Sequence, residues 1–165
     1  MSGNGKAWKI SIMLNLDASH HLNRGVLKHL RENHGGNAPI SRPDSHPDPY
    51  LHAGSHPDVV SQVWETLGGG LPADCRAIVY GTPALVHPHT GVVLALAYGT
   101  AYVINISDEI VNEAIEAGCK AERKWSSGKI TNVQELLGHG WLFGCWNKKE
   151  ADWLLATYNN LSGAT

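Results

Sequence analysis

Cysteine is scarce in this 165-residue sequence, and its three copies, Cys75, Cys119 and Cys145, are odd in number and far apart. They form no C-x-x-C pair and no even framework, which excludes the disulfide scaffold of small secreted domains. We therefore expect three free thiols and a reducing, cytoplasmic environment. Long apolar runs are also missing, since no stretch approaches about 18 consecutive apolar residues and the N-terminal residues lack a signal-peptide pattern. We expect no membrane span.

Neither sign of charge dominates the chain. It has 13 Lys and Arg against 15 Asp and Glu, a formal net charge of −2, so no global basic field favours nucleic acid or an acidic membrane. Histidine is the abundant titratable residue, because protonating all ten copies would move the formal charge from −2 to +8. With 42% hydrophobic residues, the chain 1–165 has the composition of a single globular domain.

Recognisable catalytic motifs are absent as well. The sequence contains neither H-E-x-x-H nor G-x-S-x-G, and no cysteine has a nucleophile signature. The glycine-rich run 68–71 is expected between a helix and a strand, the reverse of the order in a phosphate-binding loop. We predict no catalytic residue. These absences favour a small non-enzymatic binding or protein-interaction domain over an enzyme.

Hydrophobic periodicity predicts an α+β fold. Alternating apolar residues indicate a strand over 8–16, and helical spacing then indicates a helix that ends near 34–36. A second helix is expected over 56–68. From residue 76 the period changes to two, which predicts a three-stranded antiparallel meander with a break at Thr82-Pro83 and turns at 87–91 and 99–100.

The C-terminal half adds further elements. They are a helix over 108–117, a strand over 121–126 as a fourth strand of the meander, a short helix after Thr131, a strand over 140–146 and a last helix. The whole is expected to be a single α+β domain, an antiparallel meander sheet flanked by about five helices. In the middle strand Leu94 and Leu96 should share one face, and Ala95 and Ala97 the other, where small side chains allow a helix to pack closely.

Three capping-box patterns mark expected helix starts. In each, a polar residue is followed three positions later by a residue that can hydrogen-bond back to it. The pairs are Ser55 with Asp58, Thr131 with Gln134, and Asn147 with Glu150.

His87 and His89 form an i, i+2 pair, which in an extended segment points both imidazoles the same way. Neutral imidazole is a ligand of zinc, nickel and iron, but two ligands do not complete a site. The others would come from the Pro- and His-rich loop at about 35–54 and the residues after it, which offer Asp44, His46, Asp48, His52 and His56. One alternative function is therefore a metal-dependent hydrolase using His87, His89 and loop ligands such as His52. In the other interpretation, 87–91 is a hairpin turn whose imidazoles lie in water.

Basic side chains gather on one face of the first helix. They are His20, His21, Arg24, Lys28 and Arg31, within an arc of about 100° opposite the apolar stripe. A second alternative function is therefore nucleic-acid or anion binding at this face. A charged, solvated helix face accounts for the same pattern, and we expect no nucleic-acid partner.

Tryptophans are concentrated toward the C-terminus. In the strand 140–146, Trp141 and Trp146 lie on opposite faces, and Trp153 lies far around the last helix from its apolar stripe. Either the sheet is covered on both sides, or these side chains lie in an interface, where Trp is enriched as an anchor. We predict an interface of Trp141, Trp146 and Trp153 in a homodimer or with a small protein partner.

The order of the elements from helix 56–68 to strand 121–126 is α-β-β-β-α-β. This order resembles the core topology of the PD-(D/E)xK nuclease-like superfamily, over about 70 residues. That family needs an acid on one strand and a (D/E)-x-K on the next, whereas the corresponding stretches here are Pro83-Ala84 and 97–99, and Glu122-x-Lys124 lies on a later strand. The resemblance therefore implies no nuclease activity and no site residue.

Overall fold

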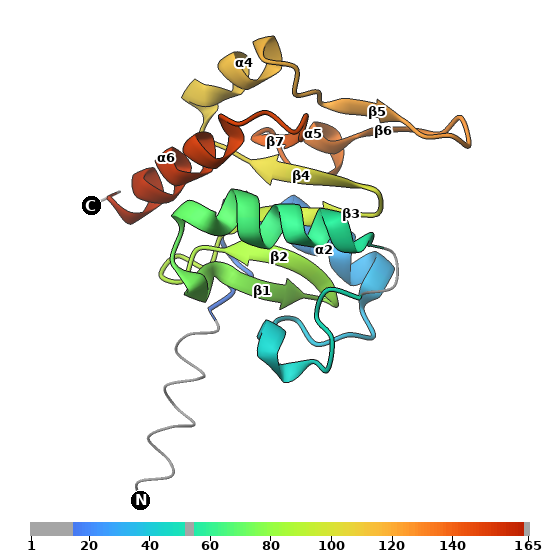
Figure 1. Ribbon diagram of the computed structural model, residues 1–165, viewed down its shortest axis with the longest axis vertical. Helices are drawn as coiled ribbons and strands as arrows, with labels where there is room; N and C mark the ends of the chain where they lie inside the picture. Colours follow the sequence, from blue (N-terminus) through green and yellow to red (C-terminus); the bar gives the residue numbers. More distant parts are fainter. Residues whose placement is uncertain (1–14, 52–54, 164–165) are drawn as a thin grey trace, which may run out of the picture.

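The structure, a computed structural model, describes residues 15–51 and 55–163. It is an α+β fold built on a five-stranded antiparallel sheet in the order β1-β2-β3-β4-β7, with a separate two-stranded sheet of β5 and β6 (Figure 1). The strands are β1 (Arg76–Val79), β2 (Thr82–Val86), β3 (Val93–Tyr98), β4 (Ala101–Asn105), β5 (Glu122–Lys124), β6 (Ile130–Asn132) and β7 (Trp141–Phe143). Most of the strand expected over 8–16 lies outside the described residues.

The predicted meander is confirmed, but it has four strands rather than three. Its first hairpin turns at Tyr80 and Gly81, both with positive φ (47° and 77°), as a two-residue type I′ turn requires. The first strand of the meander therefore ends two residues before the Thr82-Pro83 position at which the proline predicted a break. Thr82 instead pairs with Val79 as the first residue of β2.

A β-bulge in β3 changes which side chains share a face. Leu85 pairs with Ala95 and Val86 with Val93, which leaves Leu94 as the extra residue. The sheet has a hydrophobic core on each face. Leu94 therefore packs in the core on the face of Ala95, and not in the core on the opposite face with Leu96, as strict alternation predicted.

Helices cover both faces of the sheet. On one face lies a continuous helical segment made of α3 (Pro57–Ser61), a π-helical turn η3 (Gln62–Thr66) and a 3₁₀ turn η4 (Leu67–Gly70), together with α4 (Asp108–Glu116) and α6 (Glu150–Ser162). Ala95 and Ala97 face this segment, as their small size predicted. On the other face lie η1 (His21–Asn23) with α2 (Arg24–His34), and α5 (Val133–Leu136). The two cores explain why so many apolar residues of the strands are buried.

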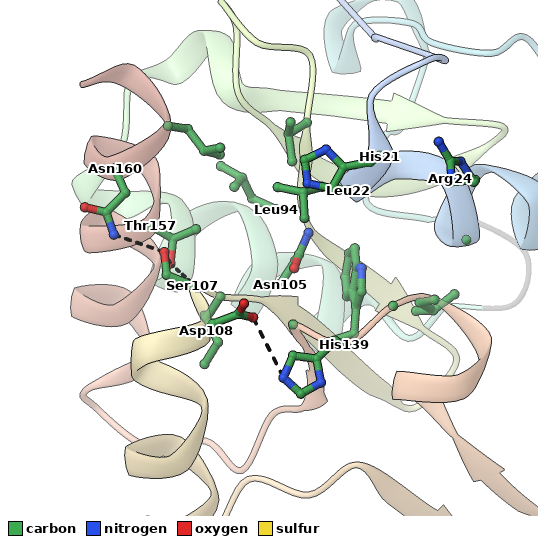
Figure 2. Close-up of a pocket in the computed structure, with 18 of the residues that line it drawn as sticks. His21, Leu22, Arg24, Leu94, Asn105, Ser107, Asp108, His139, Thr157 and Asn160 are labelled. Atoms are coloured by element: carbon green, nitrogen blue, oxygen red, sulfur yellow. Dashed lines mark hydrogen bonds and ion pairs between the residues drawn. The ribbon is translucent and has the colours of Figure 1, made fainter. Parts of the chain in front are cut away.

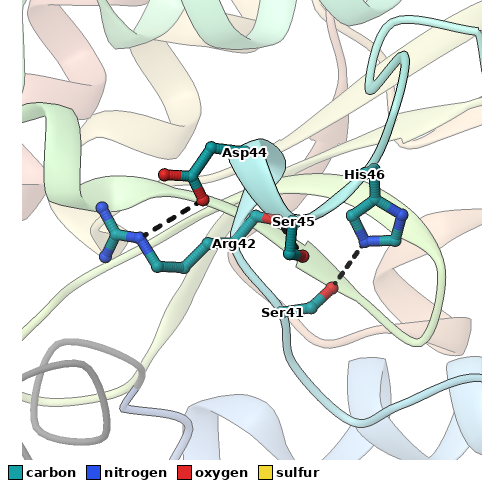
Figure 3. Close-up of polar contacts among 5 residues, drawn as sticks. All are labelled: Ser41, Arg42, Asp44, Ser45 and His46. Carbon is teal, nitrogen blue, oxygen red and sulfur yellow. Dashed lines mark hydrogen bonds and ion pairs between the residues drawn. The ribbon is translucent and has the colours of Figure 1, made fainter. Parts of the chain in front are cut away.

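The Pro- and His-rich loop runs along the outer edge of β1. Ser41 and Ile78 exchange two backbone hydrogen bonds, each 2.8 Å from N to O. Pro43–Ser45 then form a 3₁₀ turn (η2), beside which the Ser41 hydroxyl contacts His46 Nε2 at 3.0 Å and Arg42 lies 3.8 Å from Asp44 (Figure 3). The described part of this loop is thus held against the sheet.

The strand expected over 121–126 is not part of the meander. Glu122–Lys124 (β5) pairs with Ile130–Asn132 (β6), and the neighbour of β4 in the main sheet is β7. The prediction of a fourth meander strand here was wrong, because β5 finds its partner locally across a turn at Ser126–Gly128. The sheet order therefore also departs from the topology behind the nuclease-like resemblance.

The helix caps are shifted from the predicted boxes. His56, not Ser55, caps α3, because its Nδ1 accepts from the backbone N–H of Asp58 at 3.1 Å. Asn132, not Thr131, caps α5 through its Oδ1, which accepts from the backbone N–H of Gln134 and Glu135.

Within the described ranges, no helix has both the length and the apolar character needed to cross a membrane.

Candidate functional site

A half-open pocket of about 660 Å³ lies where five segments converge. They are η1 with the start of α2, the bulged part of β3, the end of β4 with the start of α4, the α5–β7 connection, and the C-terminal half of α6. Apolar side chains form much of the lining, among them Leu22, Leu94, Leu137, Trp141 and Leu161. The volume falls in the range of about 300–1,000 Å³ that is typical of small-molecule sites.

His21 and Arg24 form one side of the pocket, and Figure 2 shows them across the hollow from Asp108 and His139. Both come from the first turns of the N-terminal helix, and both are exposed. No ion pair joins the Arg24 guanidinium to an acid within the described part of the chain. A free guanidinium at a pocket rim is suited to a carboxylate, which it can bind with two parallel hydrogen bonds.

The opposite side carries acids. Asp108 lies 3.8 Å from His139 Nε2, both being mostly exposed, and Glu109 accepts a 3.0 Å hydrogen bond from Asn160 Nδ2. Glu135 also lines the pocket. The pocket thus has His21 and Arg24 on one side, and Asp108 with its partner His139 on the other, with apolar side chains in the lining between them.

Hydrogen bonds between α4 and α6 fix this acidic side. The backbone N–H of Ser107 donates to Thr157 Oγ1 at 3.0 Å, and Asn160 Nδ2 donates to Ser107 Oγ at 3.0 Å (Figure 2). Further along, Trp153 Nε1 donates to Glu113 at 2.8 Å. The start of α4 therefore cannot move independently of α6.

The indole N–H of Trp141 contributes an unpaired donor beside the pocket. It is one of three buried side-chain polar atoms without a hydrogen-bond partner among the described residues. Gly138 lies close to it, since a Cβ there would be 3.8 Å from Trp141 Nε1. An unpaired buried donor costs about 1–3 kcal/mol, and this one has almost no surface open to the pocket, so it is a local cost to the fold and not a contact point for a ligand.

A second hollow of about 740 Å³ lies at the other end of α2, lined by His29, Tyr98 and Lys129 among others. The His29 ring stacks on Tyr98 with centroids 6.0 Å apart, and burial lowers the pKa of His29. Its lining is more polar than that of the first pocket, so it offers a ligand less hydrophobic burial.

The described members of the predicted metal-ligand set do not line the first pocket. His87 is completely buried, and its Nδ1 accepts from the backbone N–H of His89 and Thr90, both at 3.1 Å. Its Nε2 contacts Ser162 Oγ at 2.7 Å, and its ring stacks on Tyr158. Both ring nitrogens of His87 are therefore engaged within the protein, and His89 is left on the turn.

The loop histidines are also dispersed. His46 contacts Ser41, His56 caps α3, and His52 lies outside the described residues. Among the described residues, the His, Cys, Asp and Glu side chains that come close enough to hold one metal ion are Cys119, Cys145 and Glu150 instead.

Two of the three tryptophans expected in an interface are buried within the chain itself. Trp141 is 1% exposed and packs under α5, and Trp153 is 4% exposed between α6 and α4. The sheet is covered on both sides, which was the other interpretation of their placement, and neither side chain offers a surface to a partner. Trp146 is 56% exposed.

The basic face of the first helix is divided. His21 and Arg24 line the pocket, His20 caps η1 by accepting from the Leu22 N–H, and Lys28 and Arg31 are exposed on α2. The pattern was visible in the sequence, but the acids that face it across the pocket come from residues 108–135.

A buried polar cluster was missed by sequence analysis. Glu150 is completely buried, and its Oε2 accepts from the Cys145 backbone N–H at 2.7 Å and lies 3.4 Å from Cys119 Sγ. Its Oε1 accepts from the Tyr102 hydroxyl, which in turn accepts from the Trp146 N–H at 2.8 Å. The capping-box pattern predicted that the Glu150 carboxylate bonds back to nearby Asn147. In the structure its hydrogen-bond partners lie up to 48 residues away in the chain.

Comparison of the chain with protein-family models, with curated proteins and with solved structures gave no match. The function is therefore inferred from the geometry of the sites.

Proposed function

We propose that this protein is a non-enzymatic binding domain whose pocket takes a small molecule with an apolar body and both an acidic and a basic group. The observation that carries the proposal is the placement of Arg24 across an apolar lining from Asp108 and Glu109. An amino acid or a short peptide with apolar side chains has this chemistry.

Each part of such a molecule has a counterpart in the lining. Its carboxylate would lie at Arg24, within reach of the imidazole of His21. Its ammonium group would lie on the acidic side, near Asp108 and Glu109, and its side chain would lie over Leu22, which is an exposed apolar side chain of the lining.

The experiment is a thermal-shift and calorimetry series on tag-free protein with leucine and dileucine. We expect dileucine to raise the Tm by about 2 °C or more at a saturating concentration, because a ligand that binds only the folded state stabilises it. N-acetyl-leucine and leucinamide each lack one charge, and both should fail to bind.

Arg24→Gln is the diagnostic variant, and Arg31→Gln is its matched control, because Arg31 lies on the same helix but does not line the pocket. We expect Arg24→Gln to weaken dileucine binding about tenfold or more, the loss of one charge-assisted pair, and Arg31→Gln to leave it unchanged. Equal binding by both variants, or no Tm shift with either probe, would contradict the proposal.

A second candidate function is self-association through Trp146. Its side chain is 56% exposed, and its backbone has a positive φ of 59°, a conformation that is uncommon for a residue of this size. The Trp146 N–H donates to Tyr102, which holds the residue in this conformation. We propose that a second copy of the chain covers this ring in a homodimer, in a reducing, cytoplasmic environment.

Light scattering tests the homodimer directly. The wild-type protein should have twice the chain mass, and Trp146→Ser should have the mass of one chain. Ile130→Ser is the control, because Ile130 is 60% exposed on the second sheet and should leave the mass unchanged. A monomeric wild-type protein would exclude this candidate without affecting the pocket.

A further inference from the structure

Two thiols from distant parts of the chain touch in the structure. Cys119 Sγ and Cys145 Sγ are 3.3 Å apart, and their segments are antiparallel neighbours, joined by the backbone bridge between Lys120 and Phe143. We propose that Cys119 and Cys145 form a reversible disulfide when a hydroperoxide oxidises the protein. This is a modification site separate from the ligand pocket.

The surroundings assign different roles to the two sulfurs. Cys145 is partly exposed, so its sulfur is the one that a hydroperoxide reaches. Cys119 is 1% exposed and is reached only by its neighbour. Burial is the main cause that raises the pKa of both thiols, so both are protonated before oxidation and need a proton acceptor. Glu150 Oε2, 3.4 Å from Cys119 Sγ, is in place to be that acceptor.

The reaction has two steps. The Cys145 thiol passes its proton to Glu150 while its sulfur attacks one oxygen of hydrogen peroxide. The O–O bond breaks, and the departing hydroxide takes that proton from Glu150, so the products are a sulfenic acid on Cys145 and one water. Cys119 then passes its proton to Glu150 while its sulfur attacks the Cys145 sulfur. The S–O bond breaks, and the departing hydroxide takes the proton from Glu150 to form a second water. Overall, two thiols lose two hydrogens and the peroxide is reduced to two waters.

A short movement of the two sulfurs would be enough to form the bond. The sulfurs must approach from 3.3 Å to about 2.05 Å. Glycines precede both cysteines, Gly118 with a φ of 117° and Gly144, so each cysteine has a neighbour without a side chain. A Cβ at Gly118 would lie 3.7 Å from the Cys145 sulfur, in ordinary contact, so nothing at this position blocks the movement.

The bond would join the segment after α4 to the segment before α6, and both helices also contribute to the pocket. Cys119 follows the C-terminal end of α4, and Cys145 precedes α6. The opposite end of α4 and the last turns of α6 carry the acidic side of the pocket. The predicted free thiols and the reducing environment agree with a bond that forms only transiently.

The test uses hydrogen peroxide on folded, tag-free protein, followed by intact-mass measurement, thiol titration and peptide mapping. We expect a loss of about 2 Da, the two hydrogens of the thiols. The free thiols should fall from three to one and return on treatment with dithiothreitol. Mapping should find the 119–145 link alone, whereas the chain unfolded in urea should give a mixture of all three pairings.

Variants separate the two roles. Cys75→Ser is the matched control and should still form the link, because Cys75 is buried elsewhere in the core. Cys119→Ser should stop at a sulfenic acid on Cys145 that dimedone labels, and Cys145→Ser should form neither product. A link to Cys75, the same mixture from folded and unfolded chains, or only intermolecular disulfides would overturn the proposal. One tightly bound zinc ion per chain that blocks both thiols would also overturn it. Cys119, Cys145 and Glu150 would then be a metal site.

Discussion

Tyr102 of β4 donates its phenolic hydrogen to the buried carboxylate of Glu150, in the first turn of α6. This contact joins an interior strand of the sheet to the last helix. Because Glu150 also accepts from the Cys145 backbone N–H, it holds the segment between β7 and α6 against the sheet. A buried carboxylate with several donors is stable only as long as all of them stay in place.

Replacing Glu150 with Gln should destabilise the protein by about 2–3 kcal/mol. The amide group brings an N–H₂ next to either the Tyr102 hydroxyl or the Cys145 N–H, each of which donates to the carboxylate, so at least one buried donor loses its acceptor. Urea unfolding measures this change. Glu122→Gln is the control, because Glu122 is exposed on β5, and it should change the stability by less than about 0.5 kcal/mol. Equal midpoints for the two variants would show that the network contributes little.

Alanine at position 144 should be severely destabilising. A Cβ on Gly144 would lie within 3 Å of three atoms of the Tyr102 ring, in a core that has no room to move that ring. We expect a loss of about 3 kcal/mol or more, as in other overpacked cores. Gly69→Ala provides the comparison, because a Cβ there meets nothing within 4 Å. Similar melting temperatures for the two alanine variants would contradict the packing seen around Tyr102.

Stability should fall as the pH drops below about 6.5. Burial, and then the charge of His89, lowers the pKa of His87 from its ordinary 6.5, and burial lowers that of His29 in the same direction. Below that pH the unfolded chain binds protons that the folded protein does not, so acid favours unfolding. Urea unfolding at pH 7, 6 and 5 measures the slope.

His87→Gln should make this acid slope shallower, because it removes one of the two imidazoles whose pKa the fold lowers. His21→Gln should leave the slope as it is, since the His21 side chain is exposed. The idea fails if the wild-type stability is the same at pH 7 and pH 5.

Stability should also fall at high pH, in this case as the pH rises. Burial, followed by the charge of Asp74, raises the pKa of Cys75 from an ordinary 9.0 to about 12. Between these values the folded protein keeps a proton that the unfolded chain loses, so the contribution of this thiol to stability is complete below about pH 9 and declines above it. The slope is about 1.4 kcal/mol per pH unit for each such thiol. Unfolding in urea at pH 8, 9 and 10 measures it, and Cys75→Ala should reduce it.

Local patterns predicted the parts of the fold that depend on neighbouring residues. Alternation in 92–105 predicted strands, and the Gly99 turn was located correctly because a glycine can adopt the positive φ of 66° found there. The Tyr80–Gly81 turn was misplaced because Pro83 is the stronger sequence signal for a break. In the structure Pro83 lies within β2, opposite Ile78.

The remaining differences depend on contacts between distant residues. Trp141 and Trp153 were expected at a surface because one helical layer does not bury both, but helices cover both faces of the sheet. The pocket brings Arg24 together with residues more than 80 positions away, and no local spacing indicates such a meeting. His21 and Arg24 were identified as candidates for anion binding, whereas no sequence pattern indicated which acids lie opposite them.

Both edges of the main sheet are occupied by other parts of the chain. Ser41 pairs with Ile78 at the β1 edge, and Lys120 pairs with Phe143 at the β7 edge. Exposed strand edges are where proteins aggregate or add a strand from a partner. At these two positions the backbone groups are already used, which protects the fold from edge-to-edge polymerisation. A loop deletion that removes Ser41 would expose β1, and the expected result is a protein that still folds but precipitates at concentrations where the intact chain stays dispersed.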